Sequence, residues 1–187
     1  MAKQGGLNIA VLGLGFGAEF VPIYLDHPDV GEVVACDIDP ARVERVARRF
    51  PQVRPATSLE AIVGDSSINA VHVVSGLSDH VTQTLAVLAA GKHRACAVPM
   101  AMSIAELREV VRAQKQSGKN YMMMETTVYT RSFLFARELA AKGEFGRIQF
   151  LRGAHYQDLE EYPSYWHGFP TSSSGASLRS ESRRSTP

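Results

Sequence analysis

The chain has 187 residues, of which 45% are hydrophobic and 21% charged, and its formal net charge is +1. This composition is typical of a globular protein with one full domain and some additional chain. Because the charge is nearly balanced, the chain lacks a field that would gather nucleic acid or an anionic membrane surface, and we expect neither as a partner.

Short apolar runs alternate with stretches of helical periodicity from the N-terminus onward. Runs without polar alternation are typical of strands that are covered on both faces. They span residues 7–13, 32–37, 68–75, 93–98 and 120–125, and a weaker run at 53–56 would make six strands. The repeated strand and helix units predict an α/β fold, a doubly wound parallel sheet of the Rossmann type.

The helices between these strands carry start and stop signals. Asp39 is placed to cap a helix that has Pro40 at its first position, where proline is favoured. Further signals are pairs with capping-box spacing and glycines where a left-handed residue would end a helix. The pairs are Thr57 with Glu60 and Ser103 with Glu106, and the glycines are Gly91, Gly118 and Gly143.

The C-terminal part of the chain departs from this alternation. A longer run over residues 147–157 predicts a strand that opens a new layer. After Thr171 the chain is rich in serine and arginine, and Leu178 is its only large apolar side chain, which is typical of a disordered segment. We predict a Rossmann domain over 5–145, the beginning of a second α/β domain over 146–170 and a disordered tail over 171–187.

The run VLGLGFGAEF at the end of the first strand is the most informative stretch. Gly13, Gly15 and Ala18 form the pattern G-x-G-x-x-A between a strand and a helix, and Asp37 ends the second strand. The first glycine permits a tight turn, the second lets the backbone approach a pyrophosphate, and the alanine lets helix and strand pack closely. The pyrophosphate would lie at the helix N-terminus, and Asp37 would accept hydrogen bonds from the adenosine ribose. We predict that the whole turn binds a dinucleotide, through Gly13, Leu14, Gly15, Phe16, Gly17 and Ala18.

The residues near this turn bear on the identity of the cofactor. Asp37 would repel a 2′-phosphate, which favours NAD over NADP, whereas Arg42 lies close enough in sequence to accommodate one. A methyltransferase that uses S-adenosylmethionine would also combine a glycine turn with a carboxylate after the second strand. That class usually has an acidic residue just before the glycines, where this chain has Val11 and Leu12. We therefore expect NAD, with NADP as the alternative.

The two cysteines, Cys36 and Cys96, each lie within an apolar run, away from any spacing typical of metal ligands. We interpret both as reduced, buried thiols and expect no metal site. The glycine-punctuated N-terminus lacks the cleavage pattern of a signal peptide, and no run reaches the ~18 apolar residues of a membrane span. We therefore expect a cytoplasmic protein.

The chain resembles the glucose-fructose oxidoreductase and inositol dehydrogenase family, the Gfo/Idh/MocA group. The resemblance rests on the glycine turn, followed in order by INAVHVVSGLSDH, AAGKHRACAVPMAMS and GEFGRIQFLRG. It implies a Rossmann domain for NAD(P), followed by an α/β domain that carries the substrate and makes oligomer contacts. It also implies oxidation of a CH–OH group of a sugar, a cyclitol or a similar polyol.

The resemblance implies further cofactor contacts beyond the glycine turn. Ser75 and Gly76 occupy the turn after the fourth strand, and His80 matches a family histidine beside the nicotinamide half of the cofactor. From the residues alone, His80 would be an ordinary early-helix residue. Pro99, with a cis peptide bond before it, would shape the pocket wall. Glu125, at the tip of the sixth strand, either faces the nicotinamide side or caps the strand in solvent.

Two family features are missing from this chain. Family members usually end the fifth strand with Glu-Lys-Pro, and the lysine helps move the proton that accompanies hydride transfer; here Ala97, Val98 and Pro99 occupy these positions. The later Asp-x-x-x-His, which supplies a catalytic histidine in the family, is absent from the sequence. We therefore assign no catalytic residue and leave enzymatic activity open. The alternative is a catalytically inactive dinucleotide-binding module, a sensor or a scaffold.

The resemblance also bears on the C-terminal segment. Family members continue with many more strands and helices, so we expect that a frameshift or a premature stop in a longer reading frame produced the tail; a genuine short paralogue would have the same appearance. Residues 155–167 are aromatic, which suits either a surface for a sugar ring or local packing. The unpaired edge of a strand at 147–157 predicts a homo-oligomer.

Overall fold

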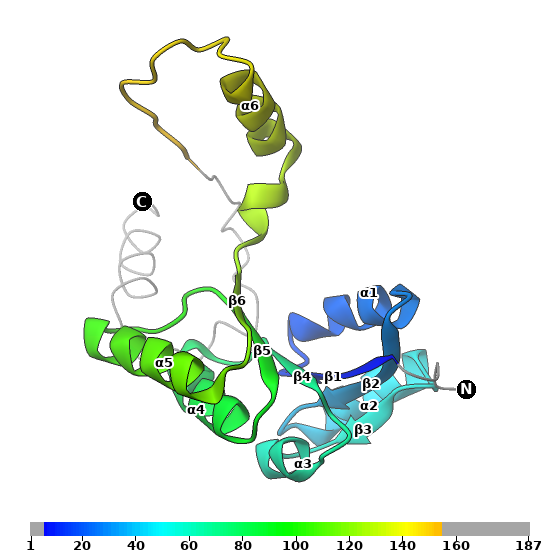
Figure 1. Ribbon diagram of the computed structural model, residues 1–187. Helices are drawn as coiled ribbons and strands as arrows, with labels where there is room; N and C mark the ends of the chain where they lie inside the picture. The colour runs from blue at the N-terminus through cyan, green and yellow to red at the C-terminus, as the bar shows by residue number, and fades with distance from the viewer. Residues whose placement is uncertain (1–5, 155–187) are drawn as a thin grey trace, which may run out of the picture. The chain divides into compact units, whose positions relative to one another are not determined.

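The computed structural model describes residues 6–154, which form two compact units, residues 6–124 and residues 125–154 (Figure 1). The first unit contains a six-stranded sheet with the order β3-β2-β1-β4-β5-β6, in which all neighbouring strands are parallel. The order reverses between β1 and β4, which confirms the predicted doubly wound sheet. Its strands are β1 Leu7–Leu12, β2 Val30–Cys36, β3 Arg54–Ala56, β4 Ala70–Val73, β5 His93–Ala97 and β6 Tyr121–Met124.

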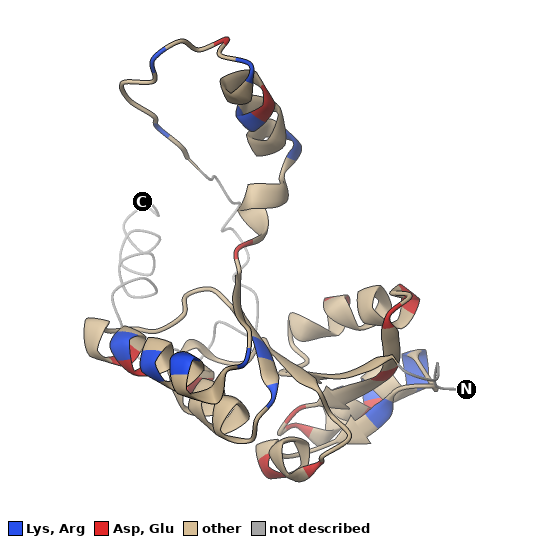
Figure 2. Ribbon diagram, viewed as in Figure 1, with Lys and Arg blue, Asp and Glu red and all other residues tan. Residues whose placement is uncertain are grey.

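Helices connect these strands and cover the sheet on both faces, because successive residues of a strand point to opposite sides. The helices are η1 Gly17–Phe20, α1 Val21–Asp26, α2 Pro40–Arg49, α3 Leu59–Gly64, η2 Leu77–Asp79, α4 His80–Ala89 and α5 Ile104–Ser117. One core lies under α1 and α2 and includes Val11, Val21 and Val43, while the other lies under α3 and α4 and includes Ile62, Val73 and Val87. Figure 2 shows acidic and basic residues interspersed along the ribbon of this unit, with several Lys and Arg residues along α5.

The capping signals are confirmed in part. Asp39 caps α2 by accepting a hydrogen bond from the amide of Ala41, and Ser103 caps α5 by accepting one from the amide of Glu106. The predicted cap at Thr57 is wrong: α3 begins at Leu59, and the hydroxyl of Ser58 accepts the hydrogen bond from Ala61. Both residues can cap a helix, and the one that directly precedes the first helical turn takes the position. The predicted left-handed glycines at 91, 118 and 143 all have positive φ.

The second unit contains the short helix η3 Thr126–Tyr129 and α6 Arg131–Ala141. The strand expected from Arg147 is wrong for residues 147–154, which carry no strand. A strand needs a neighbour to receive its backbone hydrogen bonds, and the described part of this unit supplies none. The rest of that predicted strand, the aromatic stretch 155–167 and the tail 171–187 lie outside the described residues. The domain bounds expected from the sequence stay predictions.

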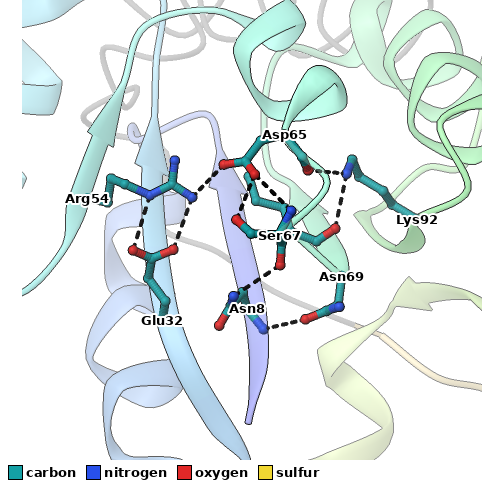
Figure 3. A network of polar contacts seen from close by, with 8 residues as sticks. Asn8, Glu32, Arg54, Asp65, Ser67, Asn69 and Lys92 are labelled. Atoms are coloured by element: carbon teal, nitrogen blue, oxygen red, sulfur yellow. Dashed lines mark hydrogen bonds and ion pairs between the residues drawn. The ribbon is translucent and has the colours of Figure 1, made fainter. Parts of the chain in front are cut away.

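A polar network joins the amino ends of the strands in the first unit (Figure 3). Arg54 makes a two-pronged contact with Glu32, at 3.1 and 3.0 Å, and a third contact with Asp65 at 2.7 Å. Hydrogen bonds from Ser67, and then from Arg54, lower the pKa of Asp65 to about 2. The buried Lys92 donates from Nζ to the carbonyl oxygens of Asp65 and Ile68, at 2.6 and 3.0 Å. This end of the sheet is therefore fastened by side chains.

We predict that Lys92→Met lowers the free energy of unfolding by about 1–3 kcal/mol, because the apolar side chain would leave two carbonyl acceptors without their charged donor. Urea unfolding followed by circular dichroism measures the change. Lys115→Met, at an exposed position of α5, is the matched control and should stay within about 0.5 kcal/mol of the wild type. Equal effects of the two substitutions would contradict a role for the Lys92 ammonium group.

Candidate functional site

The glycine turn follows β1 at the carboxyl edge of the sheet, where the strand order reverses. Gly13 has φ +94°, a conformation that side chains other than glycine rarely adopt, and its amide donates to the carbonyl of Cys36 at 2.8 Å. A β-carbon at this position would lie 2.7 Å from the amide nitrogen of Ser75 and from the carbonyl oxygen of Val74. The turn is thus pressed against the end of β4, and only glycine fits there.

The remaining residues of the turn divide between packing and exposure. Gly17 is buried, and a β-carbon there would meet Val11 and Val74 at 3.2 Å, so this glycine permits the close packing that the sequence assigned to Ala18. Ala18 packs half-buried against the same core. By contrast, Gly15 and Phe16 are exposed, and none of the described residues accepts a hydrogen bond from their amides. Those amides are available to an anion.

Asp37 follows β2 directly and turns toward the glycine turn. Its Oδ2 accepts a hydrogen bond from the amide of Leu14 at 2.6 Å, and its Oδ1 accepts one from the amide of Asp39 at 2.9 Å. The side chain is only 4% exposed. The carboxylate therefore holds two strand-to-helix turns together. An ionised carboxylate has about four lone-pair sites, so it retains capacity for further donors such as ribose hydroxyls.

Arg42 lies beside this carboxylate, on the first turns of α2. Its Nη1 is 3.5 Å from Oδ2 of Asp37, and its Nε is 3.5 Å from Oδ2 of Asp39. These are long contacts, and the side chain is 38% exposed. Arg42 can therefore leave its acidic partners at little cost, since a partly exposed ion pair contributes at most about 1 kcal/mol.

The turn after β4 is tied to the turn after β5 by His80. The hydroxyl of Ser75 donates to Gln83, and Gly76 precedes η2. His80, the first residue of α4, is 1% exposed; its Nδ1 lies 2.8 Å from the carbonyl oxygen of Pro99 and its Nε2 3.3 Å from that of Ser75. The structure thus brings Ser75, His80 and Pro99 together, and it buries the histidine.

Val98 and Pro99 follow β5 at the same edge of the sheet. The peptide bond between them is cis, and the Val98 side chain is exposed at the position where the family resemblance expects a lysine. Glu125 opens the second unit, and its Oε1 accepts a hydrogen bond from the amide of Thr127 at 3.0 Å. This contact caps the N-terminus of η3, and the two roles left open for Glu125 stay predictions.

Sequence reasoning missed two buried basic side chains beneath these turns, one on each face of the sheet. Arg94 of β5 lies on the face under α4 together with Cys96, whose burial was expected, and His72 of β4 lies on the opposite face, against Tyr24. All three side chains are at most 2% exposed. Nδ1 of His72 and the hydroxyl of Tyr24 share a hydrogen bond of 3.1 Å. Burial, and then the charge of Arg94, lower the pKa of His72 to about 4. His72 is therefore neutral at physiological pH. A basic residue inside an otherwise apolar strand run was the signal that could have identified each of them.

Two negative findings apply to residues 6–154. This part of the chain holds no group of three or more His, Cys, Asp or Glu side chains arranged to bind a metal ion. Within the same range, no helix is both long enough and apolar enough to cross a membrane.

Comparison with known proteins gives a family match over most of the described chain. Residues 7–125 match the Gfo/Idh/MocA family model, described as "Oxidoreductase family, NAD-binding Rossmann fold". A glycosyl hydrolase family 109 protein from Bacteroides thetaiotaomicron is 26% identical over an alignment of 179 residues that covers 89% of this chain and 38% of that protein. A 1-carboxy-3-chloro-3,4-dihydroxycyclohexa-1,5-diene dehydrogenase from Comamonas testosteroni is 24% identical over 154 residues, covering 82% of this chain and 39% of that protein. The chain thus spans less than two fifths of these relatives.

Solved structures show the same fold. An NAD binding oxidoreductase from Klebsiella pneumoniae superposes with a TM-score of 0.67 at 27% identity, covering 75% of this chain and 40% of the other. Scyllo-inositol dehydrogenase from Lactobacillus casei, solved with NAD(H) and scyllo-inositol, superposes with a TM-score of 0.69 at 21% identity, over 75% and 42% of the two chains. At that identity, the second likeness bears on the fold alone.

The geometry of the glycine turn predicts a large cost for a single methyl group at Gly13. We expect Gly13→Ala to destabilise the protein by at least about 2 kcal/mol, because positive φ and contact with the β4 backbone both oppose the new β-carbon. Gly64→Ala is the matched control, since nothing lies within 4 Å of a β-carbon there and alanine favours the helix. Thermal unfolding of both variants is the measurement; a Gly13→Ala protein as stable as the control would contradict the described turn.

Proposed function

This chain belongs to the Gfo/Idh/MocA oxidoreductase family, and on that premise we propose that it binds NAD at the glycine turn and that the whole protein oxidises a CH–OH group of a sugar, a cyclitol or a similar polyol. The family match provides the NAD-binding Rossmann domain. The contacts of individual residues with NAD, the substrate and the reaction are the proposed part.

The observation that carries the proposal is the open backbone of the glycine turn. The amides of Gly15 and Phe16 donate to no acceptor among the described residues, while the neighbouring amide of Leu14 donates to Asp37. Oriented amides at the start of a helix favour an anion, and a pyrophosphate supplies two charged groups at the right separation to meet successive amides. We place the adenosine ribose beside Asp37, on the side that leads from the turn to β2.

The same neighbourhood supports NAD as the preferred cofactor. A 2′-phosphate would approach the Asp37 carboxylate, and two negative charges in a poorly solvated position repel each other. Arg42 offsets part of this repulsion, because its long contacts with Asp37 and Asp39 leave it free to turn toward a phosphate. We therefore propose a preference for NAD with measurable binding of NADP.

The substrate class is supported by the family and by the names of the relatives. The Comamonas relative is a dehydrogenase named for a dihydroxylated ring, and the Bacteroides relative is named as a glycosyl hydrolase. A glycosyl group is also a hydroxylated ring. We propose such a ring as the substrate, carried by parts of the protein that lie beyond the Rossmann domain, and we retain the homo-oligomer and the cytoplasmic location as predictions.

Two other functions compete with this proposal. Cleavage of a glycosidic bond is favoured by the similarity to a glycosyl hydrolase family 109 protein over 89% of this chain. A catalytically inactive dinucleotide-binding module is favoured by Val98, because valine cannot exchange a proton and no other side chain at the described end of β5 replaces lysine. The three functions share NAD binding and differ in turnover.

Calorimetric titration tests the binding step. We expect saturable binding of NAD and weaker binding of NADP. Gly15→Val is expected to weaken NAD binding at least about tenfold, which corresponds to about 1.4 kcal/mol, because the side chain would occupy the approach of the pyrophosphate. Gly15 is exposed and has no positive φ, so the variant should keep the thermal stability of the wild type. Absence of any saturable heat with millimolar NAD would refute the binding proposal.

Turnover assays separate the three functions. With NAD and a panel of cyclitols and sugars, hydride transfer measured by nicotinamide absorbance is the expected result, and Val98→Lys should increase its rate by about 10²-fold or more, the usual contribution of general acid–base catalysis. Release of the aglycone from aryl glycosides would favour glycosidic cleavage. Binding of NAD without either reaction, in both the wild type and Val98→Lys, would favour the inactive module.

A further inference from the structure

His80 occupies an unusual position for a histidine. It is 1% exposed, and each of its two ring nitrogens lies within hydrogen-bonding distance of a backbone carbonyl oxygen, Pro99 O at 2.8 Å and Ser75 O at 3.3 Å. The two carbonyls belong to different turns, one after β4 and one after β5. His80 is therefore the link between these two turns.

The chemistry of the two partners constrains the state of the imidazole. A carbonyl oxygen only accepts hydrogen bonds, whereas a neutral imidazole has one N–H donor and one nitrogen that can only accept. With one proton, the ring would direct a lone pair at one of the two carbonyls, and a buried acceptor without a donor costs about 1–3 kcal/mol. With two protons, the ring donates to both carbonyls.

We propose that His80 is a positioning residue that acts in its doubly protonated form, holding the Ser75 and Pro99 turns together, with the buried sulfur of Cys96 as its negatively charged partner. The idea rests on the proposed function in one respect only: these turns form part of the proposed cofactor site. The charge state itself is a property of the protein without cofactor.

The surroundings of His80 support an ion pair. Burial alone would lower the pKa of His80, but hydrogen bonding with Cys96, the charge of that sulfur and the bonds to Pro99 and Ser75 together raise it above its ordinary value. Burial would raise the pKa of Cys96, yet His80 and Arg94 lower it. Arg94 and Cys96 are alternate residues of β5 and share the face that α4 covers, where Arg94 also donates to the carbonyl oxygen of His80, and Cys96 has no exposure to solvent.

The other groups around the pair are accounted for within the described residues. Arg94 donates from Nη2 to the carbonyl oxygen of His80 at 3.1 Å, and the hydroxyl of Thr84 donates to the same oxygen. Tyr121 of β6 interacts with Cys96 and stays protonated, because burial, and then the charge of Cys96, raise its pKa. Asp79, the last residue of η2, directly precedes His80 in the chain. On the side of β4 that faces α4, Val71 and Val73 are apolar.

The positioning role follows from what the Ser75 turn touches. A β-carbon on Gly13 would collide with the Ser75 amide and the Val74 carbonyl, so the glycine turn is built directly against this segment. Displacement of the Ser75 turn would therefore displace the glycine turn. Since the pKa of folded His80 is raised, its protonated contacts are present at low pH and are lost as pH rises through that pKa.

The cysteine charge can be measured directly, because the chain has only two cysteines, both buried. Cys36 is the matched control: burial, with added repulsion from Asp37, raises its pKa to about 12, so it keeps its S–H. In the infrared spectrum at pH 7, with a phosphine reductant, we expect one S–H stretching band. Cys36→Ser should remove it and Cys96→Ser should leave it. A second band that Cys96→Ser removes would overturn the ion pair.

The histidine charge is measured by NMR of ¹⁵N-labelled imidazoles, with His80→Asn assigning the signal. We expect both nitrogens of His80 to carry protons at pH 7. Cys96→Ser should lower the midpoint of this titration by about 1–3 pH units, the usual effect of one adjacent opposite charge, whereas Cys36→Ser should leave it unchanged. A singly protonated His80 at pH 7 in the wild type would overturn the proposal.

Titration of NAD across pH tests the positioning role separately. We expect NAD affinity to fall as pH rises through the midpoint found by NMR. In Cys96→Ser, the same fall in affinity should begin at a lower pH than in the wild type. An NAD affinity that stays unchanged when His80 loses its second proton would overturn the positioning role. Absence of NAD binding at every pH, together with the expected infrared and NMR results, would refute the proposed function and leave the ion pair established.

Discussion

The hydrogen bond from the Leu14 amide to the Asp37 carboxylate is the contact on which the rest of the site depends. It is short, at 2.6 Å, and it joins two strand-to-helix turns that are 23 residues apart. A buried carboxylate needs donors, and the amides of Leu14 and Asp39 supply them. By engaging Leu14, Asp37 fixes the path of the glycine turn and leaves the next amides, those of Gly15 and Phe16, without a partner in the described chain.

The two ends of the parallel sheet are built by different means. At the amino end, side chains fasten the strands to one another through Arg54, Asp65 and Lys92. At the carboxyl end the contacts are largely made by backbone groups, with Gly13 against Val74 and with His80 between two carbonyls. A ligand can reach open backbone groups only where side chains are small or turned away. The side-chain network at the amino end therefore holds the strands together, and the carboxyl end can leave backbone groups open to a ligand.

The fold was predictable from sequence because its signals are local. Apolar runs gave all six strands, and cap residues such as Asp39 and Ser103 gave the helix starts. Prediction was wrong where two neighbouring residues had equal chemistry, as with Thr57 and Ser58, and where a strand required a partner, as from Arg147.

The candidate site was predictable only in outline. The glycine turn and Asp37 follow from a spacing along the chain, whereas the burial of His80 and its contact with Pro99 depend on the pairing of β4 with β5. Contacts between elements that are distant in sequence leave no local pattern. For the same reason, Arg94 and Cys96 read as parts of an ordinary strand until the helix α4 is placed over them.

Dinucleotide binding and proton transfer place separate demands on this sequence, so one can be present without the other. Pyrophosphate binding draws on backbone amides, so it tolerates many side chains as long as the glycines stay. Proton transfer needs one ionisable group at a defined place, and valine at position 98 supplies no such group, although the strand and its cis proline turn are present. A buried His80 cannot replace it, because both of its ring nitrogens are engaged by carbonyls and it has no exposure through which to meet a substrate. If this protein transfers hydride, the accompanying proton must therefore move through a group supplied outside the described end of β5, whereas binding of the dinucleotide requires nothing beyond the turns already in place.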